Sequence, residues 1–532
     1  MADLKKEIEK RRTFAIISHP DAGKTTLTEK FLLYGGAINL AGSVKGKATA
    51  RHAVSDWMEI EKERGISVTS SVLQFNYDGK CVNILDTPGH QDFSEDTYRT
   101  LMAADSAVMV IDASKGVEAQ TRKLFKVCVM RHIPIFTFIN KMDRDAGDTF
   151  DLVDEIEKEL GIGTYAMNWP IGSGKNFKGV YDRASRSVLL FSDTQKGTKE
   201  GDLEVISIDD ENIKEKLGEE NYDTLMDEIE LLDGAGEEMD MELVTKGELS
   251  PVFFGSALTN FGVETFLKHF LKMTYSPLPR KADIGEIDPF SEDFSAFVFK
   301  IQANMNKAHR DRIAFMRITS GKFTAGMEVT HVQGGNKKMR LSQPQQMMAQ
   351  DRKIVEEAYA GDIIGVFDPG IFSIGDTITT ASKPFKFEGI PTFAPEHFAR
   401  VRQIDTMKRK QFVKGIEQIA QEGAIQIFQE YKTGMEEVIV GVVGVLQFEV
   451  LEYRLKNEYN VDIKLEKLPY EHIRWIENPE IDLDKISGTS DMRKIKDLKG
   501  RPLLLFANAW SPKMVLDRNE GLVLSEFGRG DI

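Results

Sequence analysis

The stretch that decides the fold is Ser18-His19-Pro20-Asp21-Ala22-Gly23-Lys24-Thr25-Thr26. It follows a short apolar run at 14–17 and leads into an amphipathic run at 27–33, which together predict a strand, a turn and a helix. The backbone N–H groups of such a turn and the positive end of the helix point to one place, which suits a polyphosphate. We therefore predict a phosphate-binding loop at 18–26.

Three residues would carry the chemistry of this loop. Gly23 lets the main chain approach a phosphate closely, because a Cβ would block it. Lys24 is expected to reach the β- and γ-phosphates, and the Thr25 hydroxyl to bind Mg²⁺. The usual pattern is G-x-x-x-x-G-K-[ST], and Ser18 stands where its first glycine belongs. Taken alone, the loop has a second interpretation, a surface Gly-Lys turn. His19 is expected to pack rather than to react.

The chain has 532 residues, too many for a single core, so we expect about three domains. No apolar run approaches the roughly 18 residues that a membrane span needs. Residues 1–12 are charged and lack the apolar centre of a signal peptide. The two cysteines, Cys81 and Cys128, lie in apolar stretches, so we expect buried, reduced thiols and a cytoplasmic protein.

The net charge of −15 is concentrated in one segment. Residues 200–248 hold 19 acidic side chains against three lysines, so this segment carries −16 and the rest of the chain +1. We interpret it as an insertion in the first domain, with a solvated helical face as the favoured role and a partner-docking surface as the alternative. Basic clusters at 337–340, 408–410 and 493–496 would allow contact with RNA phosphates.

The first part of the chain predicts an α/β domain with a mostly parallel sheet and helices on both faces, because apolar runs alternate with helical patterns. Four further apolar runs are expected to be strands: 82–85, 107–111, 135–139 and 251–254. Three of them lead directly into polar motifs, which is where open α/β sheets bind ligands. Residues 39–64 lack a sustained apolar period, and we expect them to be mobile.

The pattern changes twice beyond the first domain. Pro277-Leu278-Pro279 and the residues up to 290 indicate a linker. Short alternating runs punctuated by glycine then predict a β-barrel, and mixed helical and strand patterns predict an α+β domain after it. The expected boundaries are 1–280, 290–388 and 389–532.

The phosphate side of the site is completed by Asp86-Thr87-Pro88-Gly89-His90. Asp86 would hold Mg²⁺ through water, opposite Thr25. The Gly89 N–H would meet the γ-phosphate, because a peptide without a side chain turns freely. Ser67 is the expected second Mg²⁺ ligand, and Thr69, two residues on along an extended chain, is the alternative.

His90 is the catalytic candidate. In phosphoryl transfer the protein mostly positions water and neutralises charge, and a histidine beside the γ-phosphate would orient the attacking water. The alternative is a core or capping histidine. Catalysis is therefore expected to rest on His90, Lys24 and Gly89.

The most discriminating motif is Asn140-Lys141-Met142-Asp143. Guanine presents N1–H and an exocyclic amine together, and the Asp143 carboxylate would accept from both, which adenine cannot match. Asn140 would tie the base site to neighbouring loops, and the Lys141 stem would lie across the base plane. Backbone N–H groups of Ser256-Ala257, which Leu258 follows, would meet guanine O6. A charged turn is the alternative for this motif, whereas an ATPase or kinase would leave Asp143 without a role. All residues of the four motifs, 18–26, 86–90, 140–143 and 256–258, are expected to contact the nucleotide.

As a set, these motifs resemble those of the translational GTPases. The phosphate loop, Arg64-Gly65-Ile66-Ser67 and the run from Asp86 to Arg99 are most similar to the bacterial peptide chain release factor 3 family. The serines at positions 18 and 67 differ from the residues that the wider superfamily has at these positions, and they match the residues of this family. The resemblance extends over essentially the whole chain, and it implies a G domain, a β-barrel domain and a C-terminal domain.

The resemblance also implies a reaction and partners. GTP is the implied substrate, with GDP and phosphate as products and Mg²⁺ as cofactor. The ribosome is the implied activator, and the implied role is to promote dissociation of class I release factors after peptide release. A monomer without DNA or membrane partners is expected, and Asp21 is expected to help hold a monovalent cation.

Three other functions share the G-domain motifs. They are an elongation-type translocase, a ribosome-assembly or stress GTPase, and a GTP-dependent switch with little hydrolysis. A translocase needs additional C-terminal domains, for which a chain ending at Ile532 is expected to leave too little room.

Overall fold

The computed structural model describes 13 segments of the chain, and every structural statement below refers to them: 2–36, 71–88, 94–130, 132–191, 203–235, 238–303, 312–341, 345–348, 351–390, 392, 394–432, 438–478 and 481–526. The stretch at 39–64 that was expected to be mobile lies outside these segments.

The first domain is built on seven strands: β1 (Arg11–Ser18), β2 (Ser71–Tyr77), β3 (Lys80–Asp86), β4 (Ser106–Asp112), β5 (Ile135–Asn140), β6 (Gly163–Ala166) and β11 (Leu249–Phe254). They form one sheet in the order β2-β3-β1-β4-β5-β11-β6. Every neighbouring pair is parallel except the antiparallel pair of β2 and β3. Five of the seven strands, β1, β3, β4, β5 and β11, contain a buried apolar run and end in a polar residue or just before a glycine, which is the pattern that a doubly covered parallel sheet requires.

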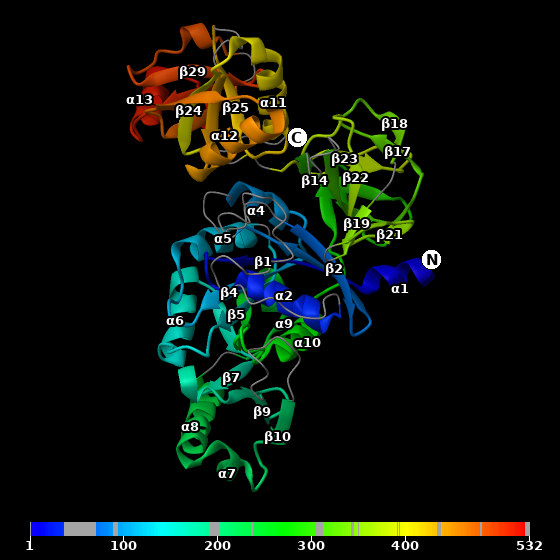
Figure 1. Cartoon of the computed structure of the whole chain (residues 1–532), viewed down its shortest axis with the longest axis vertical. Coiled ribbons are helices and arrows are strands. Elements are labelled where there is room, and N and C mark those ends of the chain that lie inside the picture. Colours follow the sequence, from blue (N-terminus) through cyan, green and yellow to red (C-terminus); the bar gives the residue numbers. More distant parts are fainter. Residues whose placement is uncertain are drawn as a thin grey trace.

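Helices cover both faces of this sheet (Figure 1): α2 (Lys24–Tyr34), α4 (Ser94–Leu101), α5 (Ala119–Met130), α6 (Thr149–Leu160), α9 (Met241–Lys246) and α10 (Val263–Met273). The N-terminal helix α1 (Ala2–Glu9) lies apart from them, and its buried Ile8 belongs to the apolar cluster of the second domain. One apolar cluster joins the sheet to α4, α5 and α6, and the other joins it to α2, α9 and α10. Alternate residues of β1 enter opposite clusters, because successive strand side chains point to opposite faces. The predicted α/β domain with helices on both faces is confirmed.

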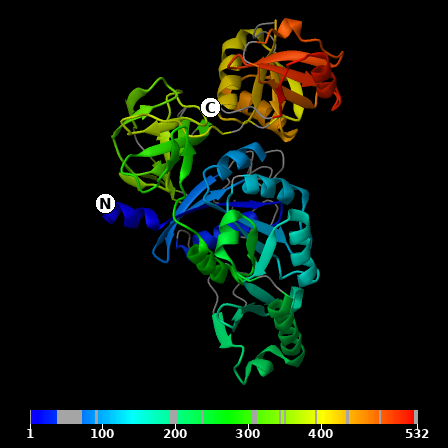
Figure 2. The ribbon, with the colours of Figure 1, turned by 180° about the vertical axis from the view of Figure 1, so that it is seen from behind.

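A small subdomain is inserted between β6 and α9: β7 (Asn168–Ile171), η2 (Gly174–Asn176), β8 (Gly179–Asp182), β9 (Ser187–Phe191), β10 (Leu203–Ser207), α7 (Ile213–Leu217) and α8 (Glu219–Ala235). Its strands form an antiparallel sheet in the order β10-β9-β8-β7, and the Trp169 indole donates to Glu228 of α8 at 2.9 Å. The acidic segment therefore contains a strand and helices that pack on a sheet, and both views place it at the end of the first domain opposite the C-terminal domain (Figures 1 and 2).

The segment expected to be a linker carries a β-hairpin, β12 (Arg280–Ala282) and β13 (Gly285–Ile287). The Arg280 guanidinium lies 3.6 Å from the ring centre of Phe297 and donates to the Met102 carbonyl at 2.8 Å. This connection is therefore packed against both domains that it joins.

The second domain is all-β: β14 (Ser295–Ala303), β15 (Arg312–Ser320), β16 (Lys322–Thr324), β17 (Glu328–His331), β18 (Lys337–Arg340), β19 (Gln345–Met348), β20 (Asp351–Ile354), β21 (Glu357–Tyr359), β22 (Ile363–Phe367) and β23 (Thr377–Thr379). Eight strands follow the order β18-β17-β23-β14-β15-β22-β19-β20, and β16 pairs with β21. The predicted β-barrel domain is confirmed, and β14 and β15 are buried along their whole length.

The third domain mixes one sheet with helices: β24 (His397–Gln403), η4 (Thr406–Lys408), α11 (Arg409–Gln421), β25 (Gln426–Glu430), β26 (Val438–Val442), α12 (Leu446–Tyr459), β27 (Ile463–Leu468), β28 (His472–Ile476), η5 (Leu483–Lys485), β29 (Met492–Asp497), β30 (Pro502–Phe506), α13 (Ser511–Arg518) and β31 (Leu524–Ser525). The strand order is β27-β24-β26-β25-β29-β30-β28-β31. An apolar cluster joins α11 and α12 to β24 and β26, as the α+β pattern predicts.

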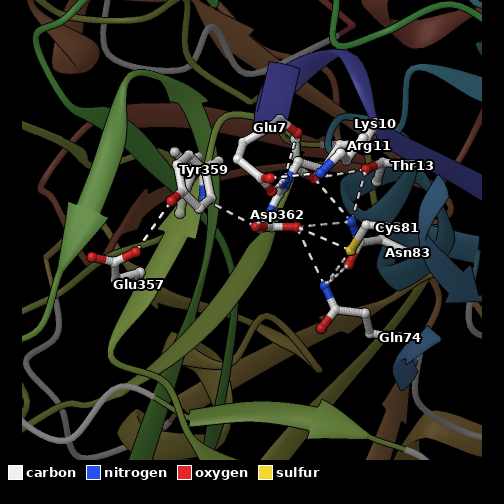
Figure 3. Close-up of polar contacts among 12 residues, drawn as sticks. Glu7, Lys10, Arg11, Thr13, Gln74, Cys81, Asn83, Glu357, Tyr359 and Asp362 are labelled. Atoms are coloured by element: carbon white, nitrogen blue, oxygen red, sulfur yellow. Dashed lines mark hydrogen bonds and ion pairs between the residues drawn. The ribbon is translucent and has the colours of Figure 1, made fainter. Parts of the chain in front are cut away.

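A buried carboxylate joins the first domain to the barrel (Figure 3). Asp362 accepts hydrogen bonds from Arg11 at 2.9 Å, from Gln74 and Asn83 at 3.3 Å each, and from the Tyr359 N–H at 2.9 Å. The Arg11 guanidinium also lies over the Tyr359 ring, 4.4 Å from its centre. Every donor but one comes from the first domain, so this carboxylate fixes the barrel against β1, β2 and β3.

Helix α4 joins all three domains. Arg99 donates to the Gly423 carbonyl of the third domain at 3.0 Å and pairs with Glu95 on its own helix. Lys300 of the barrel lies 3.5 Å from Asp96. Gly423 has a φ of 77°, and a Cβ there would come 1.7 Å from the Arg99 guanidinium, so glycine is required at this contact.

Both cysteines are free. Cys128 is buried and Cys81 is partly buried at the contact between the first domain and the barrel. Burial and the nearby Asp362 carboxylate raise the pKa of the Cys81 thiol to about 12, so the thiol stays protonated. Among the described helices, none is long and apolar enough to cross a membrane.

The Asp362 contact predicts a strong stability effect. Asp362→Ala leaves the Arg11 guanidinium buried without its carboxylate partner across the interface, which typically costs about 3–5 kcal/mol. We expect the first unfolding transition of the full chain to move to clearly lower urea concentration.

The control variant is Glu328→Ala, which removes an exposed ion pair with Lys338 elsewhere in the barrel. Exposed pairs contribute little, so its unfolding curve should overlie that of the wild type. Equal shifts for the two variants would show that the interface does not depend on the buried carboxylate.

Candidate functional site

The phosphate loop lies between the end of β1 and the start of α2. Asp21 and Gly23 both have left-handed backbone conformations, with φ of 65° and 97°. A Cβ on Gly23 would lie 2.3 Å from the Asn140 side-chain nitrogen, so only glycine allows the two loops to approach this closely. The loop is thus shaped by a contact with the neighbouring motif as well as by its own turn.

Lys24 and Asp86 form a buried ion pair at this edge of the sheet. Lys24 is the first residue of α2, and Asp86 is the last residue of β3. The Thr87 hydroxyl donates to the Ile16 carbonyl at 2.7 Å and so fastens the turn after β3 to β1. The ammonium and the carboxylate expected to act on the phosphates and Mg²⁺ are therefore adjacent.

Other loop residues surround this pair. Ser18 and Ala22 are buried, whereas Thr25 and Thr26 are partly exposed in the first turn of α2. His19 lies 3.4 Å from Glu118, and Pro20 is partly exposed beside it.

The Asn140 amide connects three loops. Its nitrogen donates to the Ala22 carbonyl of the phosphate loop at 2.8 Å, and its oxygen accepts from the Ala257 N–H at 2.8 Å. The amide is buried, so both bonds are made away from water. The tie between the base motif and its neighbouring loops is present as the sequence predicts.

Asp143 is held by Ser256, whose hydroxyl donates to one carboxylate oxygen at 2.5 Å. The Ser256 N–H donates to the Phe261 carbonyl, and the Ala257 N–H donates to Asn140. These two N–H groups therefore bond inside the protein rather than facing a base, which differs from the role expected of them. Leu258 follows them and is partly exposed.

Met142 is a structural residue of the base motif. It is buried, its N–H donates to the Gly255 carbonyl at 3.1 Å, and its carbonyl accepts from the Gly174 N–H at 2.9 Å. Its side chain thus belongs to the core, and the motif offers Asp143 and Lys141 to the outside.

Lys141 reaches back over the phosphate loop. Its ammonium donates to the Asp21 carbonyl and lies 2.6 Å from a carboxylate oxygen of Asp112. Asp112 and its partner Ser114 were not identified from the sequence. The available signal was a carboxylate at the C-terminal end of a buried strand, in register with Asn140.

Several expected residues lie outside the segments that the structure describes. They are Gly89, His90, Ser67 and Thr69. The described part of the 86–90 motif ends at Pro88, whose carbonyl accepts from the Thr97 hydroxyl of α4 at 3.2 Å. In the described segments, no three histidine, cysteine, aspartate or glutamate side chains form a group that could hold a metal.

Comparison with known protein families covers nearly the whole chain. Residues 9–276 match the elongation factor Tu GTP binding domain, residues 293–381 match elongation factor G domain 2, and residues 387–516 match the C-terminal domain of class II release factor RF3. The three matches follow the three structural domains described above.

Curated relatives and a solved structure agree with these matches. The chain is 60% identical to the peptide chain release factor 3 of Symbiobacterium thermophilum and 54% identical to that of Gloeobacter violaceus, in each case over 98% of both chains. A crystal structure of a protein from Thermus thermophilus shares the fold with a TM-score of 0.68 at 21% identity, over 92% of this chain and 72% of the other. The protein is thus a member of the peptide chain release factor 3 family of translational GTPases.

Proposed function

We propose that this protein hydrolyses GTP on the ribosome during translation termination and thereby promotes dissociation of class I release factors. One observation supports the proposal most directly: Asn140 and Lys141 are hydrogen-bonded to the loop at 18–26, so the proposed base and phosphate sites would be parts of one site. The family membership and the release-factor C-terminal domain favour termination over elongation or ribosome assembly.

Asp143 is proposed to select guanine. Its carboxylate is oriented by the Ser256 hydroxyl, and the other carboxylate edge would accept from guanine N1–H and the exocyclic amine. The Lys141 stem would cover one face of the base. Adenine offers no matching pair of donors, so the site would exclude ATP.

Lys24 and the N–H groups of the loop are proposed to bind the phosphates. In the structure Lys24 pairs with Asp86, and this pairing fits the proposal because a polyphosphate would attract the ammonium and release the carboxylate. Thr25 would bind Mg²⁺ directly and Asp86 through water, with Ser67, or alternatively Thr69, as a further ligand. When bound, Mg²⁺ neutralises charge on the β- and γ-phosphates.

His90 is proposed to orient the attacking water, with Gly89 sensing the γ-phosphate. Related switches hydrolyse GTP alone at about 10⁻⁴ s⁻¹, and an activating partner adds roughly 10⁵-fold, about 7 kcal/mol of barrier. We propose that the ribosome supplies this missing stabilisation. The protein would act as a cytoplasmic monomer, with no DNA or membrane partner.

Asp143→Asn should change the base that is bound. Asparagine keeps the shape and the acceptor for Ser256 but presents an amide to the base, so xanthine, with an oxygen in place of the exocyclic amine, becomes the better partner. We expect the ratio of GDP to xanthosine diphosphate affinity to fall by at least about 10²-fold, measured by isothermal titration with both nucleotides.

Asp145→Asn serves as the matched control, because Asp145 is an exposed carboxylate two residues further along the same turn. It should retain the preference for GDP. Unchanged base preference in Asp143→Asn would refute the assignment of the site.

Release-factor recycling on post-termination ribosomes tests the whole function. With GTP, the wild-type protein should dissociate class I factors from ribosomes through many rounds. With a non-hydrolysable GTP analogue, it should not sustain repeated rounds. His90→Ala should bind GTP normally and lose at least about 10²-fold of the ribosome-stimulated turnover.

The intrinsic rate of each protein without ribosomes is the internal control. Rapid hydrolysis by the isolated wild type, at tens per second, would contradict activation by the ribosome. Full stimulated turnover in His90→Ala would remove His90 from the mechanism.

A further inference from the structure

Asp112 is a buried carboxylate that none of the four nucleotide motifs includes. It ends β4, in register with Asn140 at the end of β5, and its side chain is 1% exposed. A buried carboxylate is costly unless it is ion-paired and hydrogen-bonded, so its partners explain why it is there.

Both oxygens of Asp112 are used. One lies 2.6 Å from the Lys141 ammonium, and the other accepts from the Ser114 N–H at 3.0 Å and from the Ser114 hydroxyl at 2.7 Å. Burial by itself would raise the pKa of Asp112, but the hydrogen bonds from Lys141 and Ser114 lower that pKa below its ordinary value. The carboxylate is therefore ionised at neutral pH and faces Lys141 in a fixed orientation.

Both the backbone and the side chain of Lys141 have a fixed conformation. Its backbone has a left-handed φ of 72°, which for a residue with a side chain costs of order 1–3 kcal/mol and persists only where the surroundings impose it. Its ammonium contacts Asp112 and the Asp21 carbonyl, and its Cε lies 3.9 Å from where a Gly23 Cβ would be. The lysine stem consequently lies across the phosphate loop.

A lysine in this place needs a counter-charge. Its stem has four flexible carbons, and its ammonium is a mobile point charge that a nearby polyphosphate would attract. Asp112 neutralises that charge on the side of β4, and the hydrogen bonds from Ser114 prevent the carboxylate from turning away.

We infer that Asp112 is a positioning residue for the guanine nucleotide: it holds Lys141 across the phosphate loop so that the lysine stem forms the surface on which the base plane lies. The inference rests on the proposed function, because it concerns the same site. Asp112 itself does not contact the nucleotide. Since the stem meets the face of the base and not its edge, loss of Asp112 weakens binding of all purine nucleotides equally and leaves base selectivity unchanged.

The test measures dissociation of a fluorescent GDP analogue from the full-length protein. Asp112→Ala should release the nucleotide at least about 10-fold faster, because it removes the counter-charge of Lys141 altogether. Ser114→Ala should release it a few-fold faster, because it keeps the ion pair and removes only the hydroxyl hydrogen bond that orients the carboxylate. The preference for GDP over inosine diphosphate should stay that of the wild type in both variants.

A double-mutant cycle separates positioning from general structural damage. If Asp112 acts through Lys141, the double variant Asp112→Ala/Lys141→Ala should release GDP no faster than Lys141→Ala alone. Multiplication of the two single effects, or dissociation at the wild-type rate in Asp112→Ala, would overturn the inference. Should Asp112→Ala not fold, Asp112→Asn and Ser114→Ala carry the same comparison.

Asp182→Ala is the matched control. Asp182 is a carboxylate at the end of β8 that accepts from the Ala184 N–H, the Ser185 hydroxyl and His269, in the inserted subdomain. It should leave GDP dissociation unchanged. The Asp143→Asn variant separates failure of the positioning role from failure of the proposed function. If base preference switches in Asp143→Asn while Asp112→Ala releases GDP at the wild-type rate, only the positioning role of Asp112 fails.

Discussion

The amide of Asn140 makes two hydrogen bonds of 2.8 Å, one to the Ala22 carbonyl of the phosphate loop and one from the Ala257 N–H. Breaking either bond leaves a buried polar group unsatisfied, which costs about 1–3 kcal/mol. Because β1, β5 and β11 end at the same edge of the sheet, one side chain can join their loops. Gly23 has no side chain at the point where the Asn140 amide packs against the loop. A larger residue at position 23 would therefore displace this amide.

Hydrogen bonds also connect the first domain to the other two domains. The turn after Asp86 leads through Pro88 to Thr97 of α4, and Arg99 on the same helix holds the Gly423 carbonyl of the third domain. Near the start of β1, away from the phosphate loop, Asp362 fixes the barrel to β1, β2 and β3 (Figure 3). The strand β1 and the helix α4, which border the candidate phosphate site, thus also contact the two appended domains.

The five middle strands of the sheet and the places of the four motifs could be predicted because buried parallel strands appear as apolar runs that end abruptly in polar turns. The edge strands β2 and β6 were not predicted. The strands of the inserted subdomain could not be predicted, since runs such as that around Val180 are only four residues long and have no motif at their ends. The link from Asp112 to Lys141 depends on strand register and on a left-handed residue, neither of which a motif encodes. For the same reason the sequence suggested backbone N–H groups at Ser256, whereas the hydroxyl of this residue orients Asp143.

The central claim, that one amide holds base and phosphate recognition together, is tested most directly by the GDP affinity of Asn140→Ala. The account predicts an affinity at least about 10²-fold weaker with native circular dichroism, because two buried hydrogen bonds are lost where the loops meet. Asn83→Ala, which removes a buried amide at the barrel contact, should keep the GDP affinity of the wild type. Wild-type affinity in Asn140→Ala would contradict the account.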